Sequence, residues 1–239
     1  MEITIIGKGV VGTATGEGFR RLGHIITYYD KGDEPKLGEV TFICTPEDIV
    51  EEVIKKLDES REWVDPPNEV LVVRSTVPPR TCDRFNHVSH NPEFLREGVA
   101  DYEFMNPTRI IVGECCVTCG DILEELYRPF NVPIIRVDPT TSELIKLASN
   151  AYLATQISFW NQIALIAEKL NVNSHVVGKA CALDPRISSY GASMHGSAYG
   201  GKCLPKDLAQ LKLVALKLGV DPCMLDAVEE MNEYLKVRK

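Results

Sequence analysis

The sequence lacks any apolar run that approaches the roughly 18 residues of a membrane-spanning helix. It also lacks the charged leader and long apolar segment of a secretion signal, since Met1–Ile6 leads directly into a glycine-containing turn. We therefore expect no membrane association and a cytoplasmic location.

Positive charge is scarce. The 239 residues include 26 Lys and Arg against 34 Asp and Glu, and the net charge is −8. Binding to a phosphate backbone needs a basic face, and no basic cluster with interleaved aromatic residues occurs, so nucleic acid is excluded as the main partner. The hydrophobic content of 44% and the charged content of 25% are ordinary for a globular protein, and the length favours two domains.

The sequence also lacks two pairs of cysteines at the spacing that zinc sites use. Among eight cysteines the only CxxC is Cys116-Val117-Thr118-Cys119, and no second pair stands at the spacing of a zinc site. A cytoplasmic chain usually keeps its thiols reduced, so we expect surface or half-buried thiols and no metal. Zinc binding or redox chemistry at Cys116 and Cys119 stays open as the alternative, and the sequence assigns no role to Cys115.

The first part of the chain alternates between short apolar runs and helical windows. This alternation is typical of a doubly wound, mostly parallel Rossmann-type sheet. The predicted strands are Glu2–Ile6, Ile25–Tyr29, Val40–Cys44, Val70–Val73, Arg109–Val112 and Pro133–Val137, and the clearest helical windows are 10–22, 48–57 and 119–127. The link from Asp30 to Glu39 is too short for the usual crossover helix and strand, so we expect an abbreviated sheet.

The period changes after Asp138. Apolar residues recur at helical spacing over 140–170, and shorter helical windows cover 206–218 and 224–236. We therefore expect an NAD-binding domain over 1–138 and an all-helical domain with a long central helix over 139–239. The glycine- and serine-rich stretch 183–201 predicts a mobile loop.

The turn after the first strand carries a dinucleotide-binding pattern. Gly7 permits a tight turn, Gly9 allows the pyrophosphate to approach, and Gly12 allows close packing of helix on strand. The helix N-terminus supplies amide groups to phosphates. Asp30, at the end of the second strand, would accept ribose hydroxyls and repel a 2′-phosphate, which favours NAD over NADP. The alternative is a set of turn glycines that bind nothing.

A second candidate site lies at Gly200-Gly201-Lys202-Cys203-Leu204-Pro205-Lys206-Asp207. Pro205 suits the first turn of a helix, which places Cys203 just outside its N-terminus. There the helix dipole and nearby lysines favour a nucleophilic thiolate. The simpler alternatives are an inert cysteine and, at Asp207, a favourable charge at a helix start.

Several separate segments resemble the UDP-glucose/GDP-mannose dehydrogenase family nearly end to end. The matching segments are Gly7–Gly12, Thr45-Pro46, Arg74-Ser75-Thr76-Val77-Pro78, His90-Asn91-Pro92-Glu93-Phe94-Leu95-Arg96-Glu97-Gly98, Glu143-Leu144-Ile145-Lys146 with Asn150, Asp184-Pro185-Arg186-Ile187 and Gly200–Asp207. The resemblance implies a four-electron oxidation of a nucleotide-sugar alcohol to a uronate, with two NAD molecules in succession. Cys203 would form a thiohemiacetal and then a thioester, which water hydrolyses.

The resemblance also implies roles for individual residues. Lys146 and Asn150, four apart on one helix face, would hold the oxyanion, and Asp207 with Glu97 and Thr76 would activate water. Lys206 would neutralise charge beside the thiolate, and Glu93 would act as an auxiliary acid. The implied substrate contacts are Glu93, Phe94, Leu95, Arg186, Tyr199 and Gly200; the implied cofactor contacts are Gly7, Gly9, Val10, Val11, Gly12, Asp30, Thr45, Pro46, Ser75, Thr76, Glu97 and Lys206. Each charged position has a simpler reading as a solvated surface group.

Relatives in this family are expected to carry a third α/β domain that closes over the nucleotide, and the sequence stops at Lys239 before one. A partner chain could supply that lid, the substrate could be smaller, activity could be poor, or the sequence could be a fragment. We expect a homodimer through the long helix, with Arg186 reaching the neighbouring subunit's substrate. The alternatives are a two-electron hydroxyacid or alcohol dehydrogenase, which needs no Cys203, and a non-catalytic NAD-binding subunit that needs a partner. The sugar and base remain unassigned.

Overall fold

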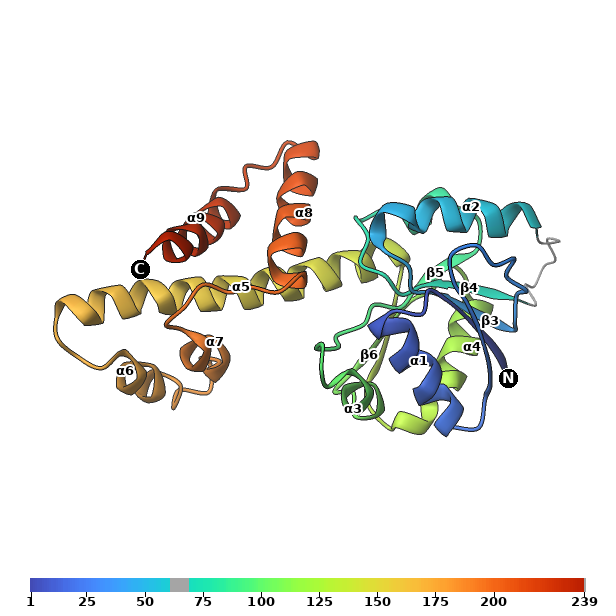
Figure 1. The fold of residues 1–239 in the computed structure, drawn as a ribbon, viewed down its shortest axis with the longest axis horizontal. Coiled ribbons are helices and arrows are strands. Elements are labelled where there is room, and N and C mark those ends of the chain that lie inside the picture. The colour runs from blue at the N-terminus through green and yellow to red at the C-terminus, as the bar shows by residue number, and fades with distance from the viewer. Residues whose placement is uncertain (61–68, 239) are drawn as a thin grey trace. The chain divides into compact units, whose positions relative to one another are not determined.

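A computed structural model describes residues 1–60 and 69–238 and divides into two compact units, Met1–Lys146 and Leu147–Lys239 (Figure 1). The first unit contains a sheet with helices on both faces, and the second contains helices. The predicted fold class, an abbreviated Rossmann-type sheet followed by helices with one long helix, is confirmed. The predicted division at residue 139 falls at the first residue of that helix, whereas the units separate later, within it.

Seven strands of the described chain form one sheet in the order β2-β1-β3-β4-β5-β6-β7. The first five strands in this order are parallel, β6 is antiparallel to β5, and β7 is parallel to β6. The strands are β1 Glu2–Ile6, β2 Ile25–Tyr29, β3 Val40–Ile43, β4 Val70–Val73, β5 Val88–His90, β6 Ile110–Gly113 and β7 Ile134–Val137. The carboxyl ends of β1, β3, β4 and β5 therefore meet at one edge, where ligands bind in such sheets.

The alternation of side chains along the strands produces two cores, one on each face of the sheet. Ile3, Ile5 and Phe42 pack with Phe19 and Phe104 on the face covered by α1 (Val10–Arg21), α3 (Ala100–Met105) and α4 (Val117–Tyr127). On the other face, Ile6 and Ile43 pack with the apolar side of α2 (Val50–Ser60), which follows the 3₁₀ turn η1 (Glu47–Ile49). Figure 1 shows α2 and α1 on opposite sides of the strands.

The link between β2 and β3 is abbreviated as predicted. Residues 30–39, all described, form neither a helix nor a strand. In the common Rossmann order 3-2-1-4-5-6, a third strand would lie outside the second. Here that strand is missing and β2 is the edge of the sheet, so the chain crosses directly from β2 over β1 to β3.

The helical unit is built on the long helix α5 (Pro139–Lys169). Its core joins Ala154 and Ile157 of α5 to Leu208 of α8 and Val228 of α9. The other helices are α6 Ser174–Cys181, α7 Ser189–Met194, α8 Cys203–Lys217 and α9 Cys223–Val237, and two further 3₁₀ turns in the first unit are η2 Cys82–Arg84 and η3 Arg128–Phe130. None of the described helices combines the length and the apolarity that crossing a membrane requires.

The stretch 183–201, predicted as a mobile loop, is instead partly helical and tied down. It contains α7. Asn161 of α5 accepts from the Gly196 amide and donates to the Ser197 carbonyl, at 2.7 and 3.0 Å. Asn232 of α9 makes the same pair of contacts with the backbone of Tyr199, at 2.8 and 3.1 Å. Outside α7, the side chains of two asparagines therefore make hydrogen bonds to backbone groups of this stretch that no helix or strand satisfies.

Four elements were not predicted from the sequence: β5, α3, α6 and α7. β5 has three residues, Val-Ser-His, and only one is apolar, so it carries no alternating pattern. The short helices span six or eight residues, which is too few for a helical period to be recognised. These elements form because the surrounding sheet and helices hold them.

We predict that Gly18→Ala destabilises the first unit although alanine is the better helix former. A Cβ at Gly18 would lie 2.0 Å from the ring of Phe104, and overpacking of this kind costs about 1–3 kcal/mol, against a propensity gain of about 1 kcal/mol. Urea unfolding would measure the loss. The double variant Gly18→Ala, Phe104→Leu should lose less unfolding free energy than the two single variants lose together, because the smaller leucine leaves room for the new methyl group. Simple additivity would show that the contact is not the cause.

Candidate functional site

The glycine-rich turn joins β1 to α1 and is tightly packed at both ends. Gly7 has a φ of 95°, and a Cβ there would lie 2.7 Å from the carbonyl oxygen of Cys44. A Cβ at Gly12 would lie 1.9 Å from the carbonyl oxygen of Gly7. A Cβ at Gly9 would meet nothing within 4 Å. The middle of the turn is therefore open to a ligand, as phosphate binding at a helix N-terminus requires.

A cavity of about 420 Å³ lies beside this turn and brings together Gly7, Asp30, Thr45 and Pro46. Asp30 is exposed, and its Oδ1 accepts the Lys31 amide at 2.8 Å. Thr45 Oγ1 is buried and has no hydrogen-bond partner among the described residues. Leaving a buried hydroxyl unpaired is unfavourable, so this atom marks a position for a ligand group. The carboxylate and the apolar wall fit the adenosine part of NAD.

The remaining predicted cofactor contacts of the sheet unit lie around this edge. Ser75 Oγ donates to the Thr45 carbonyl at 2.5 Å and thereby joins the ends of β3 and β4, and Thr76 beside it is half-buried. Val10 is 49% exposed and lines an open hollow of about 650 Å³ together with Gly9. Glu97 is exposed and lines neither hollow, and Val11 is half-buried in α1.

Lys146 and Glu93 form a buried ion pair in the sheet unit. Lys146 Nζ donates to Glu93 Oε1 at 2.9 Å and to the Glu93 carbonyl at 2.8 Å, with side chains 5% and 10% exposed. The second carboxylate oxygen accepts the Leu95 amide at 2.5 Å. The ammonium also lies 5.3 Å from the centre of the Phe94 ring. Lys146 is therefore held by the predicted substrate segment, and Glu93 is its counter-ion.

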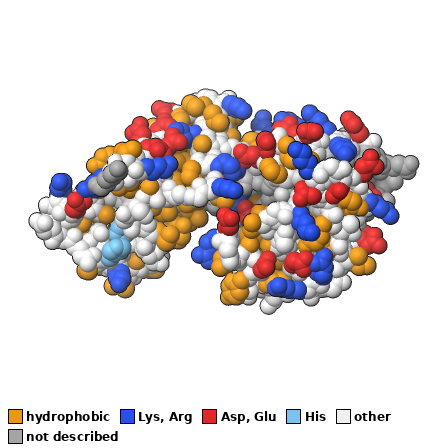
Figure 2. All heavy atoms as spheres, viewed as in Figure 1, with side chains coloured by type: hydrophobic (Ala, Val, Ile, Leu, Met, Phe, Trp, Pro, Cys, Tyr) orange, Lys and Arg blue, Asp and Glu red, His pale blue; other side chains and the backbone are white. Residues whose placement is uncertain are grey.

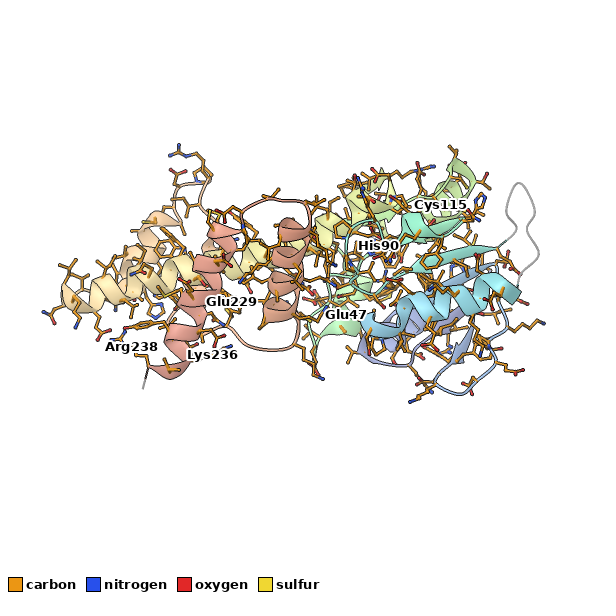
Figure 3. All side chains as sticks on the ribbon, turned by 90° about the horizontal axis from the view of Figure 1, so that it is seen from above. Glu47, His90, Cys115, Glu229, Lys236 and Arg238 are labelled. Atoms are coloured by element: carbon orange, nitrogen blue, oxygen red, sulfur yellow. The ribbon has the colours of Figure 1, made fainter. Side chains whose placement is uncertain are left out.

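Two further polar contacts anchor the start of α5, and the sequence analysis assigned no role to their residues. His90 Nδ1 lies 2.8 Å from Ser142 Oγ, and Nε2 lies 3.4 Å from the Ser75 carbonyl (Figure 3). Glu143 accepts the amides of Cys82 and Thr81 at 2.8 and 3.3 Å. The predicted motifs contained His90 and Glu143, but their partners are far away in sequence.

Burial shifts both anchoring groups toward their neutral forms. Burial lowers the pKa of His90 to about 3, so the imidazole is neutral, with the Nε2 proton facing Ser75. Burial also raises the pKa of Glu143 to about 6, although hydrogen bonds from Cys82 and from the amides of Arg80 and Thr81 oppose the shift. The anchor therefore responds to pH through two groups of opposite charge type.

Asn91 of the substrate motif has a structural role. Its side-chain oxygen accepts hydrogen bonds from Arg74 and from the Tyr127 hydroxyl, and its amide donates to the Ile111 carbonyl at 2.6 Å. Arg74 is buried and also donates to Thr15 Oγ1 at 2.8 Å. This network joins β4, the segment after β5, α1 and α4, and so fixes where the motif begins.

In the helical unit, Cys203 is the first residue of α8 and is exposed. This corrects the prediction that it lies just outside the helix: Lys202 takes the N-cap position and Pro205 stands within the first turn. Asp207, one turn further, is buried; its Oδ2 accepts from Asn150 of α5. Lys206 Nζ lies 2.8 Å from Asp207 Oδ1, an ion pair without standard hydrogen-bond geometry. The predicted residues Cys203, Lys206, Asp207 and Asn150 therefore come together.

The other predicted substrate residues of this unit are dispersed. Tyr199 is buried in the helical core, Gly200 is exposed, and Arg186 is 86% exposed and paired with Asp184 at 2.6 Å. Arg186 borders an apolar groove of about 470 Å³ along α5, whose wall includes Phe159 and Trp160. In Figure 2, hydrophobic side chains gather over parts of the helical unit, whereas acidic and basic side chains are interspersed over the sheet unit.

The cysteines after β6 differ in burial. Cys115 and Cys116 are half-buried, as predicted, and Cys119 is buried. Cys116 caps α4, and its Sγ accepts the Cys119 amide at 3.5 Å. Hydrogen bonds, first from the Cys119 thiol, lower the pKa of Cys115 to about 6, and the same contact raises the pKa of Cys119.

We predict that acid destabilises the sheet unit through His90. Its pKa is near 6.5 in the unfolded chain and about 3 when folded, so the unfolded chain binds more protons across this range. The stabilisation is complete above pH 6.5 and is lost as pH falls, by about 2 kcal/mol between pH 7 and 5. Urea unfolding at several pH values measures how the free energy of unfolding falls with acidification. This pH dependence should be weaker in His90→Asn, because asparagine does not titrate. The opposite effect of Glu143 is common to both proteins and does not alter the comparison. Equal slopes would contradict the prediction.

Comparison with known proteins identifies both units. Residues 38–131 match the NAD binding domain of the UDP-glucose/GDP-mannose dehydrogenase family, and residues 140–234 match its central domain. The UDP-glucose 6-dehydrogenase YwqF of Bacillus subtilis is 33% identical over 97% of this chain and 66% of its own. The structure of a UDP-glucose dehydrogenase from Pyrobaculum islandicum has a TM-score of 0.85 at 28% identity, over 98% of this chain and 68% of that one.

One structural neighbour shares the fold alone. The 3-hydroxyisobutyrate dehydrogenase of Mycobacterium tuberculosis has a TM-score of 0.76 at 13% identity, over 99% of this chain and 94% of that one. By contrast, this chain spans about two thirds of the length of the nucleotide-sugar relatives. The match to an NAD binding domain confirms the predicted cofactor. The chain belongs to the UDP-glucose/GDP-mannose dehydrogenase family.

Proposed function

We propose that the chain catalyses NAD-dependent oxidation of the C6 alcohol of a nucleotide sugar to the uronate, in two successive oxidations through Cys203. The observation that carries this proposal is the cluster at the start of α8. An exposed cysteine begins the helix, and a buried aspartate held by Asn150 and Lys206 follows one turn later. A two-electron dehydrogenase has no need of such a nucleophile.

The sheet unit supplies the cofactor half. When bound, NAD would supply the hydride acceptor for each of the two oxidations. Gly7, Gly9 and Gly12 admit the pyrophosphate to the helix N-terminus, and Asp30 accepts the ribose hydroxyls. Proposed contacts at Val10, Val11, Thr45, Pro46, Ser75, Thr76, Glu97 and Lys206 complete this half.

Cys203 carries the covalent half. After the first oxidation its sulfur adds to the C6 aldehyde, and the oxygen of the resulting thiohemiacetal takes up a proton. Loss of hydride from this sp³ carbon and of the proton from its hydroxyl oxygen gives a thioester, and water then breaks the carbon–sulfur bond and releases the acid and the thiol. The first turn of α8 places partial positive charge beside the sulfur, and Lys206 adds a full one. The covalent link keeps the reactive aldehyde bound.

Lys146 and Asn150 are proposed to stabilise the oxygen that gains charge. They lie four residues apart on one face of α5 and are both buried, so their donors are held in place before reaction. Asp207 is the proposed general base for water, with Glu97 and Thr76 as helpers. Glu93 orients Lys146 through their hydrogen bond, and with Phe94, Leu95, Tyr199 and Gly200 forms the proposed substrate surface.

We also propose a homodimer through the groove along α5. Its apolar wall and the exposed rings of Tyr152 and Phe159, 61% and 57% exposed, are unusual for a free surface. Arg186 borders the groove and would reach the substrate of the neighbouring subunit. A UDP- or GDP-sugar is the proposed substrate.

The first test measures NADH formed per sugar by the purified chain with UDP- and GDP-sugars. We expect two NADH per sugar, falling to one or none in Cys203→Ala because no thioester can form. Cys223→Ala is the matched control, since Cys223 is also exposed and begins a helix, α9; it should keep the value of two.

Other outcomes distinguish the alternatives. Full activity of Cys203→Ala on a hydroxyacid or simple alcohol would identify a two-electron dehydrogenase, whose fold this chain shares. NAD binding without turnover on any sugar, with turnover restored by a partner chain, would identify a non-catalytic subunit.

We predict that Asp30→Ser weakens NAD binding by about 10- to 100-fold, because hydrogen bonds to a charged group contribute about 1.5–3 kcal/mol. Discrimination against NADP should fall at the same time, since the carboxylate no longer repels a 2′-phosphate. Fluorescence or calorimetric titration measures both. Glu34→Ser, an exposed acid in the same loop that does not line the cavity, is the control. Unchanged affinity in Asp30→Ser would remove this residue from the cofactor site.

A further inference from the structure

Three soft ligands meet at the end of the sheet opposite the cofactor site. Ligand atoms of His87, Cys115 and Cys116 all lie within 4.8 Å of one another, and all three residues are half-buried. We propose that they bind one zinc-type divalent cation. The spacing of the cysteines alone predicts no such site, because the histidine is distant in sequence and the fold brings it there.

The donor set matches zinc in type and charge, and it supplies three of the four ligands of a tetrahedral ion. Zinc takes thiolate sulfur at about 2.3 Å and imidazole nitrogen at about 2.0–2.1 Å, so two ligands of one tetrahedral ion lie about 3.5–3.8 Å apart. The separations between the three atoms need to shorten by about 1 Å at most, which side-chain torsions can supply. Two thiolates and a neutral imidazole cancel the charge of a divalent cation, which suits a half-buried position.

Neighbouring groups support both sulfurs. The Cys116 sulfur accepts the Cys119 amide at the start of α4, and Ser89 Oγ lies 3.4 Å from Cys115 Sγ. Such hydrogen bonds orient metal ligands and stabilise their charge.

The location assigns the ion a structural role. His87 precedes β5, whereas the cofactor turn, Thr45 and Ser75 follow the carboxyl ends of strands parallel to β5. The register between β5 and β6 contains a single pair, His90 with Gly113. A cation bound by His87 and by Cys115 and Cys116 would link the chain before β5 to the chain after β6. It would thus tie β6 and β7, which run antiparallel to the other strands, to the rest of the sheet.

The test adds Zn²⁺ or Co²⁺ to the reduced full chain. We expect one ion per chain by competition with a chromophoric chelator, a Co²⁺ spectrum with thiolate charge-transfer and tetrahedral bands, and a higher Tm with Zn²⁺. Cys116→Ser and Cys115→Ser should weaken binding at least tenfold and abolish the rise in Tm. His87→Asn, which tolerates the φ of 50° at this position, should weaken binding while retaining the thiolate bands.

Two controls exclude other thiols. Cys223 and Cys203 are exposed and begin other helices. The variants Cys223→Ser and Cys203→Ser should bind Zn²⁺ as tightly as the parent chain. Failure of the fully reduced chain to take up stoichiometric metal, or equal uptake by the cluster variants, would overturn the proposal. The proposal would also be overturned if Cys115 or Cys116 formed a disulfide even in the presence of excess Zn²⁺.

Discussion

The geometry of the site residues in the sheet unit depends on a set of buried polar contacts at the start of α5, made by Ser142, Glu143 and Lys146. Within two turns the helix places Ser142 against His90, Glu143 against the amides of η2, and Lys146 against Glu93. All three contacts are buried, so each loses its hydration and is favourable only when its partner is in place. Together they fix the rotation of the helix about its axis, and the helical period then places Asn150 on the same side as Lys146.

This anchor is electrostatically balanced. At neutral pH His90 is uncharged, Glu143 is ionised and accepts two amides, and Lys146 is paired with Glu93. Acidification tends to charge the histidine and to discharge the glutamate, and these two effects on stability have opposite signs between about pH 4.5 and 6. A buried ion pair adds little net stability when intact, but removing one partner leaves a buried charge. The arrangement therefore serves positioning more than stability.

The regular elements could be predicted because they bury apolar residues at their own period. β1, β2 and β4 begin and end where the sequence pattern predicted, and α5 differs by one residue at each end. β5 and α3 could not be predicted, since neighbouring elements form them. Local motifs in the sequence predicted the glycine turn, Asp30 and the α8 segment. Contacts between residues distant in sequence could not be predicted in this way. They determine the counter-ion of Lys146, the role of His90 and the grouping of His87 with two cysteines. Cys203 was misplaced by one position because a proline within the first turn does not specify which residue precedes the helix.

The fold alone does not decide the chemistry, because a 3-hydroxyisobutyrate dehydrogenase shares it over nearly its whole length. The distinction lies in what the helical unit adds to a common layout. A two-electron oxidation needs donors for the oxygen that loses its proton, but no nucleophile. In the proposed mechanism, a cysteine at the start of α8 is required because the aldehyde reacts again, and the buried Asp207 is the proposed base for hydrolysis of the thioester. The pairing of an exposed sulfur with a buried, hydrogen-bonded carboxylate one turn away is therefore the feature that favours a four-electron oxidation.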